Sequence, residues 1–119
     1  MNETIETIFQ DFTVNGQLIP VSFVRYFGKS TTYITYQLEN QDGALGGDDK
    51  VIGNIDYYDF DIYSKSNYLA IIESVKEKLT QNGFTWQPNR SSGDLYEDDT
   101  GYYHRTLSFA IEREENING

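Results

Sequence analysis

The chain of 119 residues has no cysteine and little positive charge. The missing thiols exclude disulfide bonds, thiolate metal sites and cysteine-based catalysis. Nine Lys and Arg stand against 19 Asp and Glu, which gives a formal net charge of −10. Nucleic-acid binders need clustered cations to displace counterions, and anionic lipid repels so negative a surface. We therefore expect a protein partner, with no sequence-specific nucleic-acid binding and no membrane binding.

Long apolar runs are also missing. No stretch approaches the ~18 apolar residues that cross a bilayer, and the N-terminus lacks the charged-then-apolar pattern of a signal peptide. We therefore expect a soluble, intracellular protein. The hydrophobic content is only 38%, but ten Tyr, seven Phe and one Trp supply much of it. Because these aromatic side chains can fill a core, we expect residues 1–113 to form a single α+β domain and residues 114–119 to fray.

Apolar residues at helical spacing predict two helices. The first spans residues 4–12, and its buried face consists of Ile5, Ile8, Phe9 and Phe12. The second begins after Ser64 or Ser66, either of which can cap it, and Asn82-Gly83 ends it. Its buried face consists of Tyr68, Ile72, Val75 and Leu79.

Alternating and β-branched or aromatic residues predict the strands. These are residues 19–27, 31–39, 51–63, 84–87 and 102–112. We expect the first two to pair as an antiparallel hairpin around Gly28-Lys29-Ser30. On the last strand, Tyr103, Leu107, Phe109 and Ile111 are expected to face the core. This order of elements predicts an α+β fold, a largely antiparallel β-sheet with two helices packed on one face.

Two acidic stretches are predicted to be connections. Residues 40–49 and 89–100 are rich in Gly, Asp and Asn, so they have little apolar surface to offset the entropy of ordering. We expect both to be mobile in a free subunit and ordered in an assembly. The glycines at 43–47 do not form a phosphate-binding loop, since two Asp follow them in place of Lys-Ser or Lys-Thr.

Paired carboxylates are the first candidate for chemistry. Asp59 and Asp61 lie two apart on a strand and share a face, with Asp56 on the other side. Such a pair can serve acid–base catalysis or bind a hard cation. The segment lacks the glycine and the closing glutamate of a calcium loop, so we interpret it as an exposed strand face.

His104 is the only histidine and the second candidate. A general base needs an orienting carboxylate, which Glu97 or Asp99 would have to supply. We favour a surface or interface histidine. The sequence thus predicts no enzyme, no metal site and no cofactor.

Several short segments together resemble one family. They are residues 32–36, 61–65, 83–84, 94–100, 103–105 and 107–109. The series resembles small proteins from the tail-morphogenesis region of long-tailed phages and prophages of Gram-positive bacteria, which are similar to tail-terminator (tail-completion) proteins. That resemblance implies a sheet flanked by helices and a homo-oligomeric, hexameric ring that caps the tail tube where the head attaches. It further implies a virion tail protein, assembled in the host cytoplasm, with the tail tube protein and head–tail connector proteins as partners.

Three functions remain open at this point. The first is the tail terminator, the second a head–tail connector subunit, and the third an acidic inhibitor or immunity-type protein whose charge blocks a basic partner. If the chain assembles, the residues expected at its interfaces are Asp48, Asp49, Tyr57, Asp59, Asp61, Tyr96, Glu97 and His104.

Overall fold

The computed structural model describes residues 2–45 and 51–114. The helices are α1 (Asn2–Ile8), α2 (Leu69–Gln81) and the 3-10 helix η1 (Pro88–Arg90). The strands are β1 (Thr13–Val14), β2 (Gln17–Leu18), β3 (Val21–Phe23), β4 (Thr32–Leu45), β5 (Val51–Ser64), β6 (Thr85–Trp86), β7 (Leu95–Glu97) and β8 (Tyr102–Glu114). Glu114 is thus the last residue of β8, and the rest of the predicted frayed tail lies outside the described residues.

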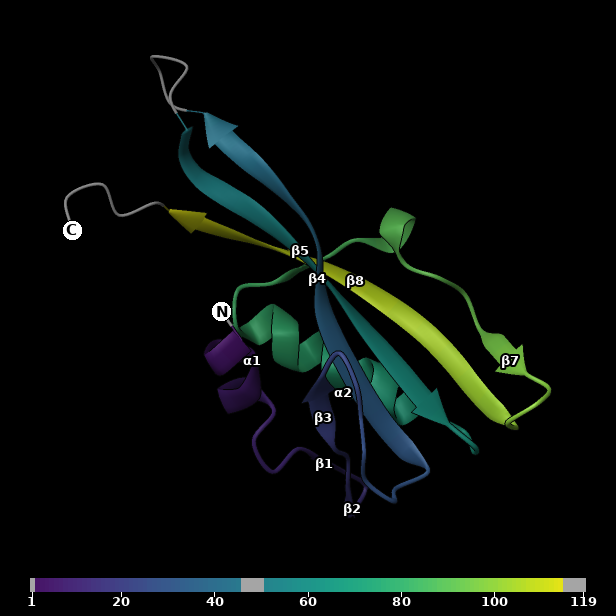
Figure 1. Cartoon of the computed structure of the whole chain (residues 1–119). Coiled ribbons are helices and arrows are strands. Elements are labelled where there is room, and N and C mark those ends of the chain that lie inside the picture. The colour runs from purple at the N-terminus through teal and green to yellow at the C-terminus, as the bar shows by residue number, and fades with distance from the viewer. Residues whose placement is uncertain (1, 46–50, 115–119) are drawn as a thin grey trace.

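The main sheet has the order β3-β4-β5-β8-β6. Strand β7 also pairs with β8, on the same edge as β6 but at other residues. Every pairing in it is antiparallel except β3 with β4. Helices α1 and α2 cover one face, and the other face carries no helix layer among the described residues (Figure 1). The α+β fold with a largely antiparallel sheet is therefore confirmed.

The core lies between the helices and the three long strands. Tyr58, Phe60 and Ile62 alternate inward along β5, as predicted, because side chains two apart share a face of a strand. Phe60 is fully buried and lies within 6.5 Å of the rings of Phe9, Tyr36, Phe84 and Phe109. The apolar stripe of α2 packs on these residues and consists of Ile71, Ile72, Val75 and Leu79.

The predicted antiparallel hairpin of residues 19–27 with 31–39 is wrong. Strand β3 has three residues and runs parallel to β4, with Val21 opposite Ile34. Val24 adopts a φ of 65° and donates its amide to Tyr36 O at 2.9 Å, which turns the chain away from the sheet. Residues 24–31 then return to the start of β4. Alternation in the sequence indicates a strand but not its direction. The return loop makes β3 parallel to β4.

The predicted loop 40–49 begins six residues too early. Strand β4 continues through residues 40–45, which pair with residues 51–57 of β5 after a register shift between Leu38 and Asn40. Backbone pairing holds this segment although its side chains are polar. With the end of β8, the two strands project beyond the helices as an arm (Figure 1). The remainder of that loop, 46–50, lies outside the described residues.

Helix ends also differ from the prediction. Helix α1 ends at Ile8, not Phe12, although Phe9 and Phe12 are still buried. Neither Ser64 nor Ser66 caps α2: Tyr68 is the N-cap, and Asn67 Oδ1 accepts the amide of Leu69 at 3.0 Å.

The predicted connection 89–100 contains regular structure, namely the end of η1 and strand β7. The Tyr103 side chain is 42% exposed and does not join the core. It lies opposite Tyr96 because β7 pairs with the start of β8, where the helix layer no longer covers the sheet.

Gly83 ends α2 as predicted, with a φ of +90°. A Cβ there meets no atom within 4 Å, so replacement by alanine is opposed only by the left-handed backbone. We expect Gly83→Ala to lower the free energy of unfolding by about 1–2 kcal/mol. Gly93→Ala is the matched control, since Gly93 has an equally open site without a positive φ. Denaturant unfolding checks this, and equal values for the two variants would contradict the strain.

Candidate functional site

A polar cluster lies at the centre of the sheet face opposite the helices. Asp61 on β5 accepts hydrogen bonds from Thr106 Oγ1 on β8 at 2.5 Å and from Gln37 Nε2 on β4 at 2.9 Å. His104 Nε2 lies 3.1 Å from the same carboxylate. We call Gln37, Asp61, His104 and Thr106 the Asp61 cluster. Strand register builds it, because Thr106 is directly opposite Asp61 and His104, opposite Tyr63, is two residues away from Thr106 on the same face of β8.

The two neighbouring carboxylates on β5 have opposite pKa shifts. Burial raises the pKa of Asp61, but hydrogen bonds from His104, Thr106 and Gln37 outweigh it, so the pKa lies below the ordinary 3.8. Burial also raises the pKa of Asp59, and there the opposing effect of the Ser108 hydroxyl is too small to reverse the shift. Hydrogen bonds therefore stabilise the charged form of Asp61, whereas burial disfavours the charged form of Asp59.

A row of stacked rings crosses the same face beside the Asp61 cluster. Ring centroids are 4.6 Å apart for Tyr26 and Tyr33, 4.9 Å for Tyr33 and Tyr63, and 4.2 Å for Tyr63 and His104. The Tyr102 ring meets Tyr33 and Tyr63 edge-on. Burial raises the pKa of Tyr33, and that of Tyr63 to about 12, so these phenols stay neutral at physiological pH. The row holds the His104 ring in a fixed orientation toward Asp61.

Arg90 lies on the other side of the Asp61 cluster. Its guanidinium carbon is 4.0 Å from the centroid of the Tyr57 ring, and its Nη2 donates to Glu39 Oε2 at 2.8 Å. Helix η1 brings Arg90 there, across the edge of β8. A planar cation on an aromatic face with a carboxylate partner is a favourable arrangement for a surface pair.

The structure brings together half of the predicted interface residues on this face. They are Tyr57, Asp59, Asp61 and His104. Glu97 is opposite Tyr102 and sits at the edge of the same face, whereas Tyr96 is opposite Tyr103 and sits on the other one. Asp48 and Asp49 lie outside the described residues.

Two interpretations of these residues are wrong. Asp61 is not part of an exposed strand face, since its side chain is only 13% exposed. The carboxylate beside His104 is Asp61 and not Glu97 or Asp99. Cross-strand register decides both points, and a single strand's alternation does not reveal which residues of the neighbouring strand lie opposite. Asp56, on the core face, is fully buried.

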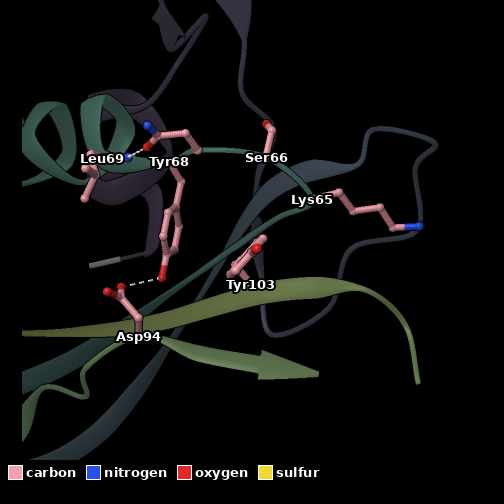
Figure 2. Close-up of a pocket in the computed structure, with 7 residues that line it drawn as sticks. Lys65, Ser66, Tyr68, Leu69, Asp94 and Tyr103 are labelled. Atoms are coloured by element: carbon pink, nitrogen blue, oxygen red, sulfur yellow. Dashed lines mark hydrogen bonds between the residues drawn. The ribbon is translucent and has the colours of Figure 1, made fainter. Parts of the chain in front are cut away.

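A pocket at the β7 edge of the sheet was missed from the sequence. It has a volume of about 440 Å³ and is lined by residues 65–69 together with Asp94 and Tyr103. Figure 2 shows the Tyr68 ring between α2 and β8, with its hydroxyl donating to Asp94 Oδ1 at 2.5 Å. Burial and this bond raise the pKa of Tyr68. The one signal in the sequence is the polar composition of residues 64–67, which is typical of an exposed connection between β5 and α2.

The polar side chains at the centre of the uncovered face bond to one another. Within residues 2–45 and 51–114, no three His, Cys, Asp or Glu side chains come close enough to hold a metal ion. The Thr106 hydroxyl donates to Asp61, so its proton is directed into the cluster rather than toward solvent. The arrangement can position side chains for contact with another surface.

No model of a protein family matches the chain, and a search of curated proteins finds no match. In the described part of the chain, none of the helices has both the length and the apolar character needed to cross a bilayer.

Proposed function

We propose that this chain is a structural assembly subunit, a tail terminator that forms a ring on the tail tube of a long-tailed phage or prophage and offers a surface for head attachment. It would act in the virion tail without catalysis, with tube and connector proteins as partners. The family resemblance supports this, because most of its scattered segments meet in space. Thr32 is opposite Ser64, and Ser64 is opposite Tyr103, so residues 32–36, 61–65, 94–100 and 103–105 lie at one end of the sheet.

The projecting arm is the observation that carries the proposal. In the described residues, no strand pairs with the outer edge of β4 after Tyr36. Asn40, Gln41 and Asp42 are exposed on this edge. A long unpaired edge outside the helix layer offers backbone donors and acceptors to another chain by strand addition. A monomeric inhibitor has no evident need for such an arm.

Assembly should depend on salt in a characteristic way. Each subunit carries a formal charge of −10, so subunits repel at long range. The screening length falls from about 30 Å at 0.01 M salt to about 8 Å at 0.15 M. We therefore expect the isolated chain to be largely monomeric at low salt and to form larger species as salt rises or when tail tubes supply a template. Sedimentation velocity over concentration and salt, with and without tubes, measures this.

A variant of the arm tests whether its outer edge contributes to assembly. Ile34 directs its amide outward to Pro20 O, and amides alternate along a strand. The register shift after Leu38 reverses this alternation, so the Gln41 amide faces away from β5. Gln41→Pro removes that outward donor and is expected to raise the concentration needed for assembly about tenfold, the effect of ~1.4 kcal/mol. Gln41→Thr keeps the amide and is the matched control.

Two outcomes would count against these ideas. If Gln41→Pro assembles like Gln41→Thr, the arm edge is not a contact. If the unaltered chain stays monomeric at every salt and neither caps tubes nor joins heads, the terminator is wrong. Tight binding of a basic protein by that monomer would then favour the acidic inhibitor.

A further inference from the structure

Exposed apolar side chains gather at two opposite edges of the main sheet. At the β3 edge they are Phe23, Val24 and Phe27. At the β7 edge they are Leu69, Tyr96 and Tyr103. Strand β3 is at one edge of the sheet, and β7 pairs with β8 at the opposite edge. The width of the sheet therefore separates the two groups. We call them the β3 patch and the β7 patch.

The β3 patch has the form of a projection. Phe27, on the return loop 24–31, is 84% exposed, the highest value among the exposed large hydrophobic side chains of the described residues. The Arg25 guanidinium carbon lies 5.4 Å from the centroid of its ring. An aromatic ring and a cation are therefore presented together.

The β7 patch has the form of a recess. Leu69 and Tyr103 line the 440 Å³ pocket, a volume within the ~300–1,000 Å³ typical of ligand sites. Asp94, at its wall, is 61% exposed, accepts the Tyr68 hydroxyl and lies 3.9 Å from Arg105 Nη1. Lys65 also lines the pocket, but its side chain points away from Asp94 (Figure 2), and its ammonium lies 5.0 Å from the Tyr102 ring centroid. The apolar floor suits an aromatic ring, and a cation carried by that ring would face the acids of β7 and its turn, outside the pocket.

The two edges carry opposite charge. Residues 12–38, which include β3 and the return loop, contain Arg25 and Lys29 but no Asp or Glu. Residues 94–101, which include β7, contain no Lys or Arg and four acids, Asp94, Glu97, Asp98 and Asp99. In a chain with a net charge of −10, this stretch of 27 residues carries two cations and no acid, although Glu6 of α1 accepts the Tyr36 hydroxyl beside it. Opposite potentials orient two surfaces toward each other.

We propose that the β3 patch of one subunit docks on the β7 patch of the next, with Phe27 entering the pocket and Arg25 and Lys29 facing the acids of residues 94–99. The inference rests on the proposed function, because the occupant is a second copy of this chain. The chain itself provides both the projection and a recess of matching charge. Two different surfaces in contact make a head-to-tail interface, which closes into a ring when the rotation per subunit allows.

Complementary variants test this arrangement. Phe27→Asp places a charge on the projection and leaves the pocket unchanged. Leu69→Asp, at the first residue of α2, places a charge in the pocket and leaves the projection unchanged. Both side chains are largely exposed, so both variants should fold, which circular dichroism verifies. Thr80→Asp adds the same charge at an exposed position on α2, outside both patches, and is the matched control. Assembly is followed by sedimentation velocity under the salt at which the unaltered chain forms rings.

We expect each variant alone to need at least tenfold more protein to assemble, while Thr80→Asp behaves like the unaltered chain. An equimolar mixture of Phe27→Asp and Leu69→Asp retains one intact projection and one intact pocket. It should therefore form one-to-one dimers that do not grow. The double variant should stay monomeric.

Other results separate the two proposals. Unimpaired rings from both single variants would overturn the docking but leave the terminator intact. Variants that are monomeric alone and also in the mixture would overturn the head-to-tail arrangement. An unaltered chain that never associates, even on tail tubes, would overturn both.

Discussion

Phe60→Ala is expected to lower the free energy of unfolding by about 3–5 kcal/mol. Phe60 is fully buried on β5, and its ring contacts aromatic rings from β4, β8 and the turns that follow α1 and α2. Alanine leaves a cavity that these rings cannot close without a shift of the backbone that carries them. Since small domains are stable by only about 5–15 kcal/mol, the loss would be a large share of the total.

The matched control is Phe27→Ala, which removes the same atoms from an exposed position and should change stability by less than about 0.5 kcal/mol. Denaturant unfolding of dilute, monomeric protein, followed by the fluorescence of Trp86, gives both values. If Phe60→Ala fails to fold, Phe60→Leu leaves a smaller cavity and keeps the test quantitative. Equal losses at positions 60 and 27 would mean that the core is not centred on Phe60.

Alternation of side chains predicted the layers of this fold but not its connections. The inward positions of β5 and the stripe of α2 are set by burial on one face, which repeats every two or 3.6 residues and is visible in the sequence. The direction of β3 depends on the turn at Val24, where φ is positive and the amide donates to Tyr36 O. The arm depends on backbone pairing, which polar residues such as those at 40–43 support without any apolar pattern.

The candidate site divides in the same way. The sequence placed Asp59 and Asp61 on one face correctly, because that follows from spacing within a strand. It could not assign His104 to Asp61, because that contact depends on the register between β5 and β8. At the pocket, Tyr68 at the start of α2 contacts Asp94, which is 26 positions further along the chain, and no local pattern predicts such a contact.

Asp61→Asn is expected to destabilise the protein at neutral pH by about 1.5–3 kcal/mol, the usual effect of hydrogen bonds to a buried charge. The folded state holds Asp61 with a pKa below 3.8, so it binds that proton less readily than the unfolded chain does. The carboxylate therefore contributes stability above pH ~4, and the contribution is lost as the pH falls through the folded pKa. The difference between the unaltered chain and Asp61→Asn should shrink as the pH falls below 4.

Asp59→Asn is the matched control with the opposite sign. Its folded pKa is raised above 3.8, so the folded state favours the protonated carboxyl and the anion opposes folding at neutral pH. Asn should therefore leave stability at pH 7 unchanged or raise it, and any gain should disappear as the pH falls and Asp59 takes up its proton. Chemical unfolding at several pH values separates the two variants, which lie two residues apart on one strand. If both variants lose the same stability with the same pH dependence, the hydrogen bonds of the Asp61 cluster do not distinguish the two carboxylates.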